Sequence, residues 1–381
     1  MEFGKSDEQQ ALFDSIVRFA QNELNDDVIG RDARHEFGHE GWQKCADFGI
    51  PGLPVVAEYG GQDADPVTIA IAMEALGYGC ADNGLIFALN AHMWSCVIPL
   101  VSFGTDEQKR RYLPGLCDGS MIGVQGMTEP ESGSDAFSLT TRFDERGGEV
   151  VLNGAKTFIS NAPVAGLFIV FARATGTTGI SGLQAFIVER DTPGLTVGAP
   201  FRKMGLHTAP MSELILDDCV LPASNSLGPP GSGMAVFNTS MDWERSFILA
   251  SSIGTMQRRL EESVAYAKQR RQFGSAIGDF QAVSHRLVDM KVRLDAGRLL
   301  LYHLAWLKSQ GRRTAAESAA TKLFLSDAFL HSSLDALQVH GGYGYMEEAG
   351  LERDVRDAVA ARIYSGTSDM QRNIIARSLG L

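Results

Sequence analysis

Hydrophobic residues recur with a helical period at both ends of the chain and with a different pattern in the middle. Over residues 6–116 the apolar positions are three and four apart, as in Leu12, Ile16 and Phe19, which is the spacing of one face of an α-helix. The same period returns after the Gly-Pro-Pro-Gly-Ser-Gly run at residues 228–233 and continues to the end. The pattern predicts two helical parts separated by another kind of structure.

The middle of the chain reads as strands. Between about residues 121 and 221, apolar runs rich in Val, Ile and Phe begin at Glu149, Gly166, Leu183 and Leu214 and are separated by turn residues. We therefore expect an α+β, multi-domain protein with an N-terminal helical domain, a middle antiparallel β domain and a C-terminal helical domain. The expected domains span residues 1–118, 119–230 and 231–381.

Composition excludes several classes of protein. The chain has 381 residues, and 34 Lys and Arg against 46 Asp and Glu give a net charge of −12, which does not attract nucleic acid. Apolar stretches such as residues 166–172 fall far short of the ~20 residues of a membrane helix, and the first ten residues lack the apolar core of a signal peptide. Five cysteines stand singly, without a Cys-x-x-Cys pair. We expect a cytoplasmic protein without membrane, nucleic-acid or disulfide chemistry.

One segment matches a metal-binding pattern. Residues 35–39 read His-Glu-Phe-Gly-His, and in zinc peptidases two such histidines bind the metal while the glutamate acts as base. That chemistry requires a continuous helix, whereas Gly30, Gly38 and Gly41 interrupt this stretch and each glycine inside a helix costs about 1 kcal/mol relative to alanine. We interpret the segment as a surface loop and expect no metal site. The glycine motifs of Rossmann and P-loop nucleotide-binding proteins are absent from the sequence.

A glutamate on an apolar helix face is the most informative single residue. Phe237, Met241, Glu244 and Ile248 follow one another four, three and four residues apart, so they share one face of a helix. A carboxylate placed there either pairs with a nearby arginine or has its pKa raised by desolvation and serves as a base. The residues alone leave both interpretations open, and the ion pair is the simpler one.

Four other segments carry hydroxyl, amide or cationic groups beside glycine. Such groups suit a polar cofactor ring or a pyrophosphate, and they are equally common in solvated turns and at helix ends. The segments are residues 128–135, 270–274, 338–342 and 363–369.

In this order and spacing, these segments resemble the acyl-CoA dehydrogenase family over nearly the whole chain. The resemblance implies an N-terminal helical domain, a β domain and a C-terminal four-helix bundle, assembled as a homotetramer with FAD at the subunit interfaces. Further matching segments are residues 54–61, 104–114, 153–161, 280–281 and 342–345.

The resemblance also implies a set of FAD-binding residues. Met127, Thr128 and Ser134 would line the flavin and its phosphates. Phe158 stands where the family usually has Trp against the flavin ring, and Ser160 stands where it usually has Thr near the flavin N5. The residues expected to reach the FAD of a neighbouring subunit, including its adenosine side and its phosphates, are Arg270, Phe273, Gln281, Gln338, Gly341, Gly342 and Thr367.

The expected catalytic base is displaced from its commonest position. Many family members have a glutamate in the place of Ser365, and serine cannot remove an unactivated α-proton. A smaller branch, which includes isovaleryl-type and long-chain-type enzymes, has the glutamate where Glu244 stands before Arg245. The resemblance therefore implies that Glu244 is the base, that Arg245 binds substrate and that the backbone N–H of Ser365 polarises the thioester carbonyl.

The implied reaction is FAD-dependent α,β-dehydrogenation of an acyl thioester. Residues 240–245, 281–286 and 364–371 resemble the branch that acts on acyl or prolyl-like aminoacyl groups on acyl or peptidyl carrier proteins in secondary metabolism. The main alternative is a short-chain or branched-chain acyl-CoA dehydrogenase that uses a CoA thioester. A flavin oxidase or hydroxylase of the same fold and a silent FAD-binding scaffold are further alternatives. The sequence leaves open whether an electron-transfer flavoprotein or oxygen accepts the electrons.

Overall fold

The N-terminal part is helical, as the sequence predicts. The computed structural model describes residues 4–381. The helices are α1 (Asp7–Glu23), α2 (Val28–Arg34), α3 (His39–Asp47), α4 (Pro66–Gly79), α5 (Asn83–His92), α6 (Ile98–Phe103) and α7 (Asp106–Cys117). Helices α1 and α7 each begin with a capping box. The side chain of Ser6 or Thr105 accepts from the backbone N–H three residues later, and the glutamine at that position accepts from the backbone N–H of Ser6 or Thr105.

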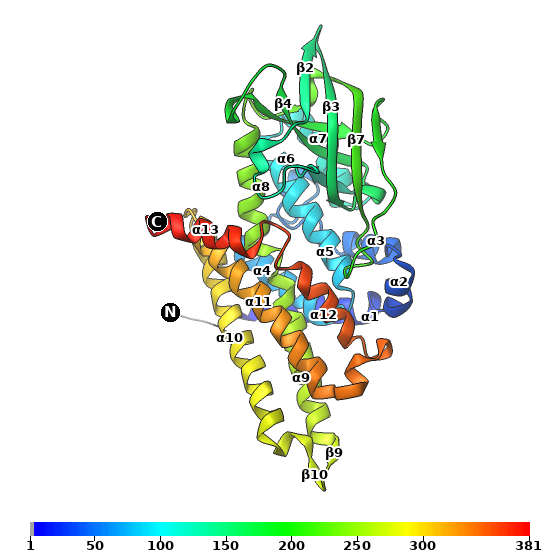
Figure 1. Ribbon diagram of the computed structural model, residues 1–381, viewed down its shortest axis with the longest axis vertical. Coiled ribbons are helices and arrows are strands. Elements are labelled where there is room, and N and C mark those ends of the chain that lie inside the picture. Colours follow the sequence, from blue (N-terminus) through cyan, green and yellow to red (C-terminus); the bar gives the residue numbers. More distant parts are fainter. Residues whose placement is uncertain (1–3) are drawn as a thin grey trace.

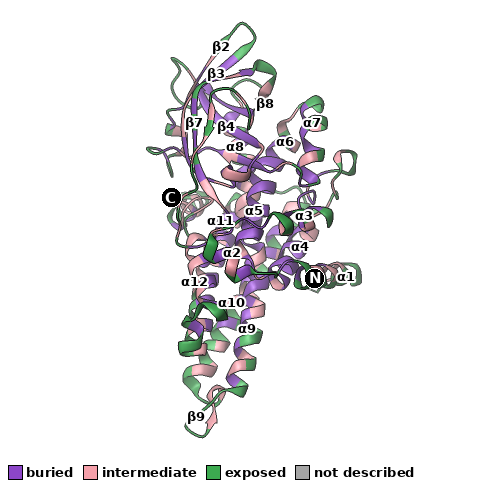
Figure 2. Cartoon of the chain, turned by 90° about the vertical axis from the view of Figure 1, so that its right-hand side faces the viewer, coloured by how far each residue is buried: buried purple, intermediate pink, exposed green. Residues whose placement is uncertain are grey.

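One helical stretch is more apolar than we expected. Helices α5 and α6 are joined by a π-helical turn at Met93–Val97, and the continuous stretch Asn83–Phe103 has 21 residues with a mean hydropathy of 1.6. By length and composition it could cross a membrane, so the expectation that apolar stretches fall far short of this was wrong. In the fold 94% of its apolar window is buried by other elements, as in the core helix of a globular domain (Figure 2).

The middle domain is a mixed sheet of eight strands in the order β6-β7-β3-β2-β4-β5-β8, with β1 beside β4. Strand β4 runs parallel to β1 and β2, so the prediction of a purely antiparallel domain was wrong at these two pairs and right at the others. An apolar pattern indicates which residues are buried but not the direction of a strand. The strands are β1 (Gly123–Gly126), β2 (Arg142–Arg146), β3 (Glu149–Ser160), β4 (Leu167–Ala174), β5 (Leu183–Glu189), β6 (Leu195–Val197), β7 (Met211–Pro222) and β8 (Ser226–Leu227).

The C-terminal part is the predicted helical bundle; its first helix runs up beside the sheet, and most of the other helices extend away from the sheet along the long axis (Figure 1). Helix α4 packs closely against this bundle at Gly77. A Cβ at that position would lie only 1.9 Å from the Ser251 carbonyl oxygen, so the close approach requires glycine. A small hairpin of β9 (Arg271–Gln272) and β10 (Ser275–Ala276) connects α9 to α10. The helices are α8 (Gly233–Phe247), α9 (Ala250–Gln269), α10 (Gln281–Ser309), α11 (Ala315–His340), α12 (Leu351–Ala360) and α13 (Ser368–Ser378).

Candidate active site

Glu244 and Ser365 meet although 121 residues separate them in the chain. Glu244 lies in the last turn of α8, and Ser365 lies in the turn that precedes α13. The Ser365 hydroxyl donates to Oε1 of Glu244 at 2.6 Å. The sequence singled out Ser365 only for its backbone N–H, so this side-chain contact was missed. The two expected catalytic positions are thus in direct contact.

The surroundings of Glu244 suit a general base. Burial raises the pKa of its carboxyl group, against the opposing effects of the Ser365 hydroxyl and the positive charges of Arg245 and Lys322. A raised pKa increases the affinity of the carboxylate for a proton. Arg245 donates from Nε to the Ser365 carbonyl oxygen at 3.4 Å, so the neighbouring arginine holds the turn and does not take the carboxylate in a simple ion pair.

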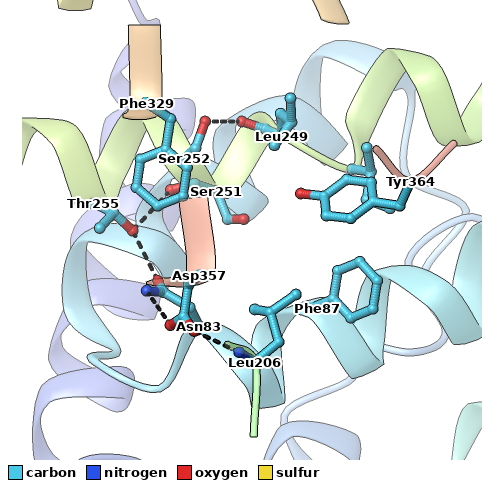
Figure 3. A pocket seen from close by; sticks show the side chains of 11 residues that line it. Asn83, Phe87, Leu206, Leu249, Ser251, Ser252, Thr255, Phe329, Asp357 and Tyr364 are labelled. Carbon is cyan, nitrogen blue, oxygen red and sulfur yellow. Dashed lines mark hydrogen bonds between the residues drawn. The ribbon is translucent and has the colours of Figure 1, made fainter. Parts of the chain in front are cut away.

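A small cavity lies next to Tyr364, the residue that precedes Ser365 (Figure 3). It has a volume of about 30 Å³ and is bounded by Ile248, one helical turn after Glu244, and by Tyr364, which precedes Ser365. The rings of Tyr364 and Phe87 form one wall, with centroids 4.9 Å apart. At the opposite side burial raises the pKa of Asp357 to about 7. This cavity therefore has one aromatic and one polar wall, and neither Glu244 nor Ser365 is among the residues that line it.

The expected flavin residues of the β domain lie on two adjacent segments. Met127 and Thr128 follow β1, and the Thr157 N–H of β3 donates to the Thr128 carbonyl oxygen at 2.9 Å. Next to it, Phe158 adopts φ 57° and its side chain is 63% exposed. A bulky residue held in the left-handed region with an open aromatic face is a strained arrangement that suits stacking of a planar ligand. Ser160, half-buried at the end of β3, lies on the same segment.

Ser134 is exposed in the turn between β1 and β2. The same turn is anchored by a residue that sequence reasoning missed, Glu129, which is 2% exposed. Its carboxylate accepts from Lys156 Nζ at 2.7 Å and from the backbone and hydroxyl groups of Thr140 and Thr141. Burial opposes ionisation, but Lys156 and the threonine donors prevail and lower the pKa of Glu129 to about 2. The sequence contained a signal for this ion pair, because Glu129 and Lys156 lie in two of the segments that resemble the family, residues 128–135 and 153–161.

The expected residues of the C-terminal domain gather elsewhere. A cavity of about 450 Å³ at the far end of α9 and α11 brings Arg270 together with Gly341 and Gly342. Around it Phe273 is 96% exposed, and Gln281 and Gln338 are exposed as well. A guanidinium, backbone groups and the rings of two tyrosines, Tyr266 and Tyr343, form a donor set that fits a nucleotide and its pyrophosphate.

Within one chain the two groups of expected FAD residues lie on different parts of the fold, one just after β1 and on β3 in the sheet and the other at the far end of α9 and α11, beyond the sheet (Figure 1). Thr367 belongs to neither, because its hydroxyl accepts from the Met370 N–H and caps the N-terminus of α13. A single chain therefore does not bring these residues into one site.

The His-Glu-Phe-Gly-His segment does not form a helical metal motif. Helix α2 ends before His35, and α3 begins at His39, so the two histidines belong to different helix ends. His35 stacks on His207 with centroids 3.9 Å apart, and Glu36 pairs with Arg34. The helical context that zinc peptidases require is missing.

Sequence models of acyl-CoA dehydrogenases match the chain along most of its length. The N-terminal domain matches residues 6–120, the middle domain residues 125–219 and the C-terminal domain residues 231–380. The chain belongs to the acyl-CoA dehydrogenase family. The resemblance stated from the sequence is thereby confirmed, as are its three-part fold and its class of reaction.

Among relatives of this acyl-CoA dehydrogenase are proteins that act on a carrier-bound amino acid. An L-prolyl-[peptidyl-carrier protein] dehydrogenase of Pseudomonas fluorescens is 42% identical over 100% of both chains. The crystal structure of the prolyl acyl carrier protein oxidase AnaB is 47% identical, with a TM-score of 0.98 over 99% of this chain and 100% of that one. The structure of PigA with FAD and proline is 41% identical, with a TM-score of 0.97 over 100% of both chains.

Proposed function

We propose that the protein is an FAD-dependent dehydrogenase of a prolyl-like aminoacyl group carried as a thioester on a carrier protein. The observation that carries this proposal is the full-length similarity to prolyl-carrier dehydrogenases, together with a base at Glu244. A short-chain or branched-chain acyl-CoA dehydrogenase is the alternative.

The cofactor is FAD, as in the PigA structure with FAD. Met127, Thr128, Phe158 and Ser160 would hold its flavin, because they lie on adjacent segments beside an exposed ring. When bound, FAD accepts the hydride that leaves the β-carbon of the substrate.

The chain's own groups handle the proton and the charge. Glu244 removes the α-proton, and the Ser365 hydroxyl holds its carboxylate in place. The backbone N–H of Ser365 stabilises the negative charge that develops on the thioester oxygen. One proton and one hydride leave the substrate, which gives the α,β-unsaturated thioester.

A second copy of the chain would complete each FAD site. The flavin residues lie on the sheet and the Arg270 cavity lies at the far end of α9 and α11, and α10 presents an apolar stripe at intervals of four and seven residues. Such an exposed helix face is typical of a subunit interface. This supports the proposed homotetramer. The stripe consists of Val288, Val292, Leu299 and Trp306, which are 57%, 60%, 53% and 50% exposed.

Arg270→Ala should weaken FAD binding by about 10- to 100-fold, because a charge-assisted hydrogen bond contributes about 1.5–3 kcal/mol. Titration of the FAD-free protein with FAD, followed by flavin fluorescence, measures the effect. Arg312→Ala is the matched control, since Arg312 is exposed in the loop between α10 and α11. Equal affinity in both variants would contradict the place given to Arg270.

Prolyl thioester on a peptidyl carrier protein should be dehydrogenated faster than prolyl-CoA or butyryl-CoA. Mass spectrometry of each thioester after incubation with the FAD-loaded protein shows how many pairs of hydrogen atoms its acyl group has lost. Equal or faster turnover of butyryl-CoA would favour the acyl-CoA alternative. Repeating the assay with oxygen alone and with an electron-transfer flavoprotein identifies the electron acceptor.

A further inference from the structure

The turn at Ser365 and Gly366 is held by buried side chains from two helices. Lys322 on α11 donates from Nζ to the Gly366 carbonyl oxygen at 2.8 Å. Gln371 on α13 donates from Nε2 to the same oxygen at 2.7 Å and to the Ser365 carbonyl oxygen at 3.2 Å. Both side chains belong to residues with 0% exposure. The peptide planes that follow Ser365 are therefore fixed from two sides.

The turn requires these bonds because its backbone is strained. Ser365 has φ 55°, in the left-handed region, where a residue other than glycine costs about 1–2 kcal/mol. Gly366 follows with φ 83°, and a Cβ there would lie 2.9 Å from Nε2 of Gln371. This conformation brings the Ser365 hydroxyl to Glu244. Without the donors, the turn would relax and the carboxylate would lose its partner.

A lysine is a costly residue for this position. Burying an ammonium group costs several kcal/mol, and apolar residues of similar volume often replace buried charges without loss of stability. Burial lowers the pKa of Lys322 to about 8, while the charge of Glu244 opposes the change. The ammonium bonds a backbone carbonyl and not a carboxylate. Stability alone therefore does not account for a lysine here.

We infer that Lys322 is a positioning residue for the catalytic base: with Gln371 it fixes the Ser365–Gly366 turn, and through the Ser365 hydroxyl this turn orients the carboxylate of Glu244. The inference rests on the proposed role of Glu244. It adds a charge effect, because Lys322 also favours the ionised carboxylate. The other charged or titratable groups that face Glu244 are Arg245 on α8 and Tyr364 in the turn before α13.

Lys322→Met should slow flavin reduction by about 10- to 100-fold, as expected when a catalytic group is misplaced by a fraction of an ångström to an ångström. FAD affinity should be unchanged, and thermal stability should be unchanged or higher. Since the ionised form of Glu244 is active and loses a nearby positive charge, the pH profile of the reduction rate should move to higher pH. Anaerobic stopped-flow spectroscopy of the FAD-loaded protein across a pH series measures both effects.

Gln371→Leu provides a second variant that removes other hydrogen bonds to the same turn, those from Gln371 to the Ser365 and Gly366 carbonyl oxygens, without removing a charge. It should slow reduction to a similar extent and move the pH profile less. Lys291→Met, which removes an exposed lysine paired with Asp295 on α10, is the matched control and should change neither. If Lys322→Met fails to fold, a slow Gln371→Leu variant with normal FAD content supports the inference, and a normal rate overturns it.

The inference is overturned if Lys322→Met reduces flavin within about twofold of the parent rate and its pH profile does not move. A fall in rate that merely follows a loss of FAD or of secondary structure in both variants would overturn it too. Glu244→Gln is measured in the same series. If Glu244→Gln is slow while Lys322→Met is normal, only the role of Lys322 is wrong, whereas a normal Glu244→Gln rate refutes the proposed base itself.

Discussion

Glu244→Gln should slow reduction of the bound flavin by about 10²- to 10⁴-fold, the range typical for loss of a general base. Glutamine keeps the volume of the side chain and can still accept from the Ser365 hydroxyl, but it cannot take up the α-proton. FAD affinity should stay the same, since Glu244 is not among the residues expected to bind the cofactor. Ser365→Ala removes the hydrogen bond that orients the carboxylate but leaves the base and the backbone N–H, so it should slow reduction less than Glu244→Gln and about as much as Lys322→Met, by about 10- to 100-fold.

Anaerobic stopped-flow spectroscopy of flavin bleaching with a thioester substrate measures this change. In the parent protein the rate should rise with pH, because the ionised carboxylate is active, and burial places this rise above the usual range of a glutamate. Glu145→Gln, which alters an exposed carboxylate on β2, is the control and should match the parent. Near-normal bleaching in Glu244→Gln would show that the base lies elsewhere.

Lys156→Met should destabilise the β domain by about 3–5 kcal/mol, because removal of one partner leaves the carboxylate of Glu129 buried without its counter-charge. Hydrogen exchange around β3 should then be faster by about 150- to 5,000-fold, since each 1.36 kcal/mol corresponds to a factor of ten. Hydrogen exchange of peptides that cover β3 measures this change. Lys291→Met breaks an exposed ion pair and should change exchange on α10 only slightly.

The same ion pair gives the protein a defined response to acid. The pKa of Glu129 is lowered from 4.5 to about 2, so its contribution to stability is complete above about pH 4.5 and is lost as the pH falls towards 2. Protection of β3 should decrease over that interval, and less so in Lys156→Met, where the pKa of Glu129 is closer to its ordinary value. The double variant Glu129→Gln with Lys156→Met should be less destabilised than the sum of the single changes. Strict additivity would mean that the two groups do not act as a pair.

Periodicity and turn residues predicted the order of the helical and β parts, because both depend on local spacing. The strands that begin at Glu149 and Leu183 and the helix that carries Glu244 were all found where the pattern placed them. The direction of β4 was not predictable, since pairing between strands distant in sequence is not encoded in the alternation of side chains. The apolar helix at 83–103 was overlooked because scattered polar residues such as Asn90 interrupt its longest runs.

The site was predicted in part. Glu244 could be singled out because a carboxylate stood on an apolar helix face, and the family resemblance then gave it a role. The contact with the Ser365 hydroxyl was not predictable, because it joins residues far apart in the chain and depends on a strained turn. Lys322 left a detectable signal, since it occupies a buried position on α11 between Ser318 and Leu325, where an apolar residue is the ordinary choice.

Because the two groups of FAD residues are separated within one chain, a mutation in one subunit can affect an FAD site that it shares with another subunit. In the homotetramer we propose, Arg270 of one subunit serves the flavin held beside Phe158 of another. A change at Arg270 therefore damages the site of a neighbour, while the base of the altered subunit stays intact. Two defective alleles, one altered at Arg270 and one at Glu244, can complement each other, because a mixed oligomer contains some sites in which both residues are unaltered.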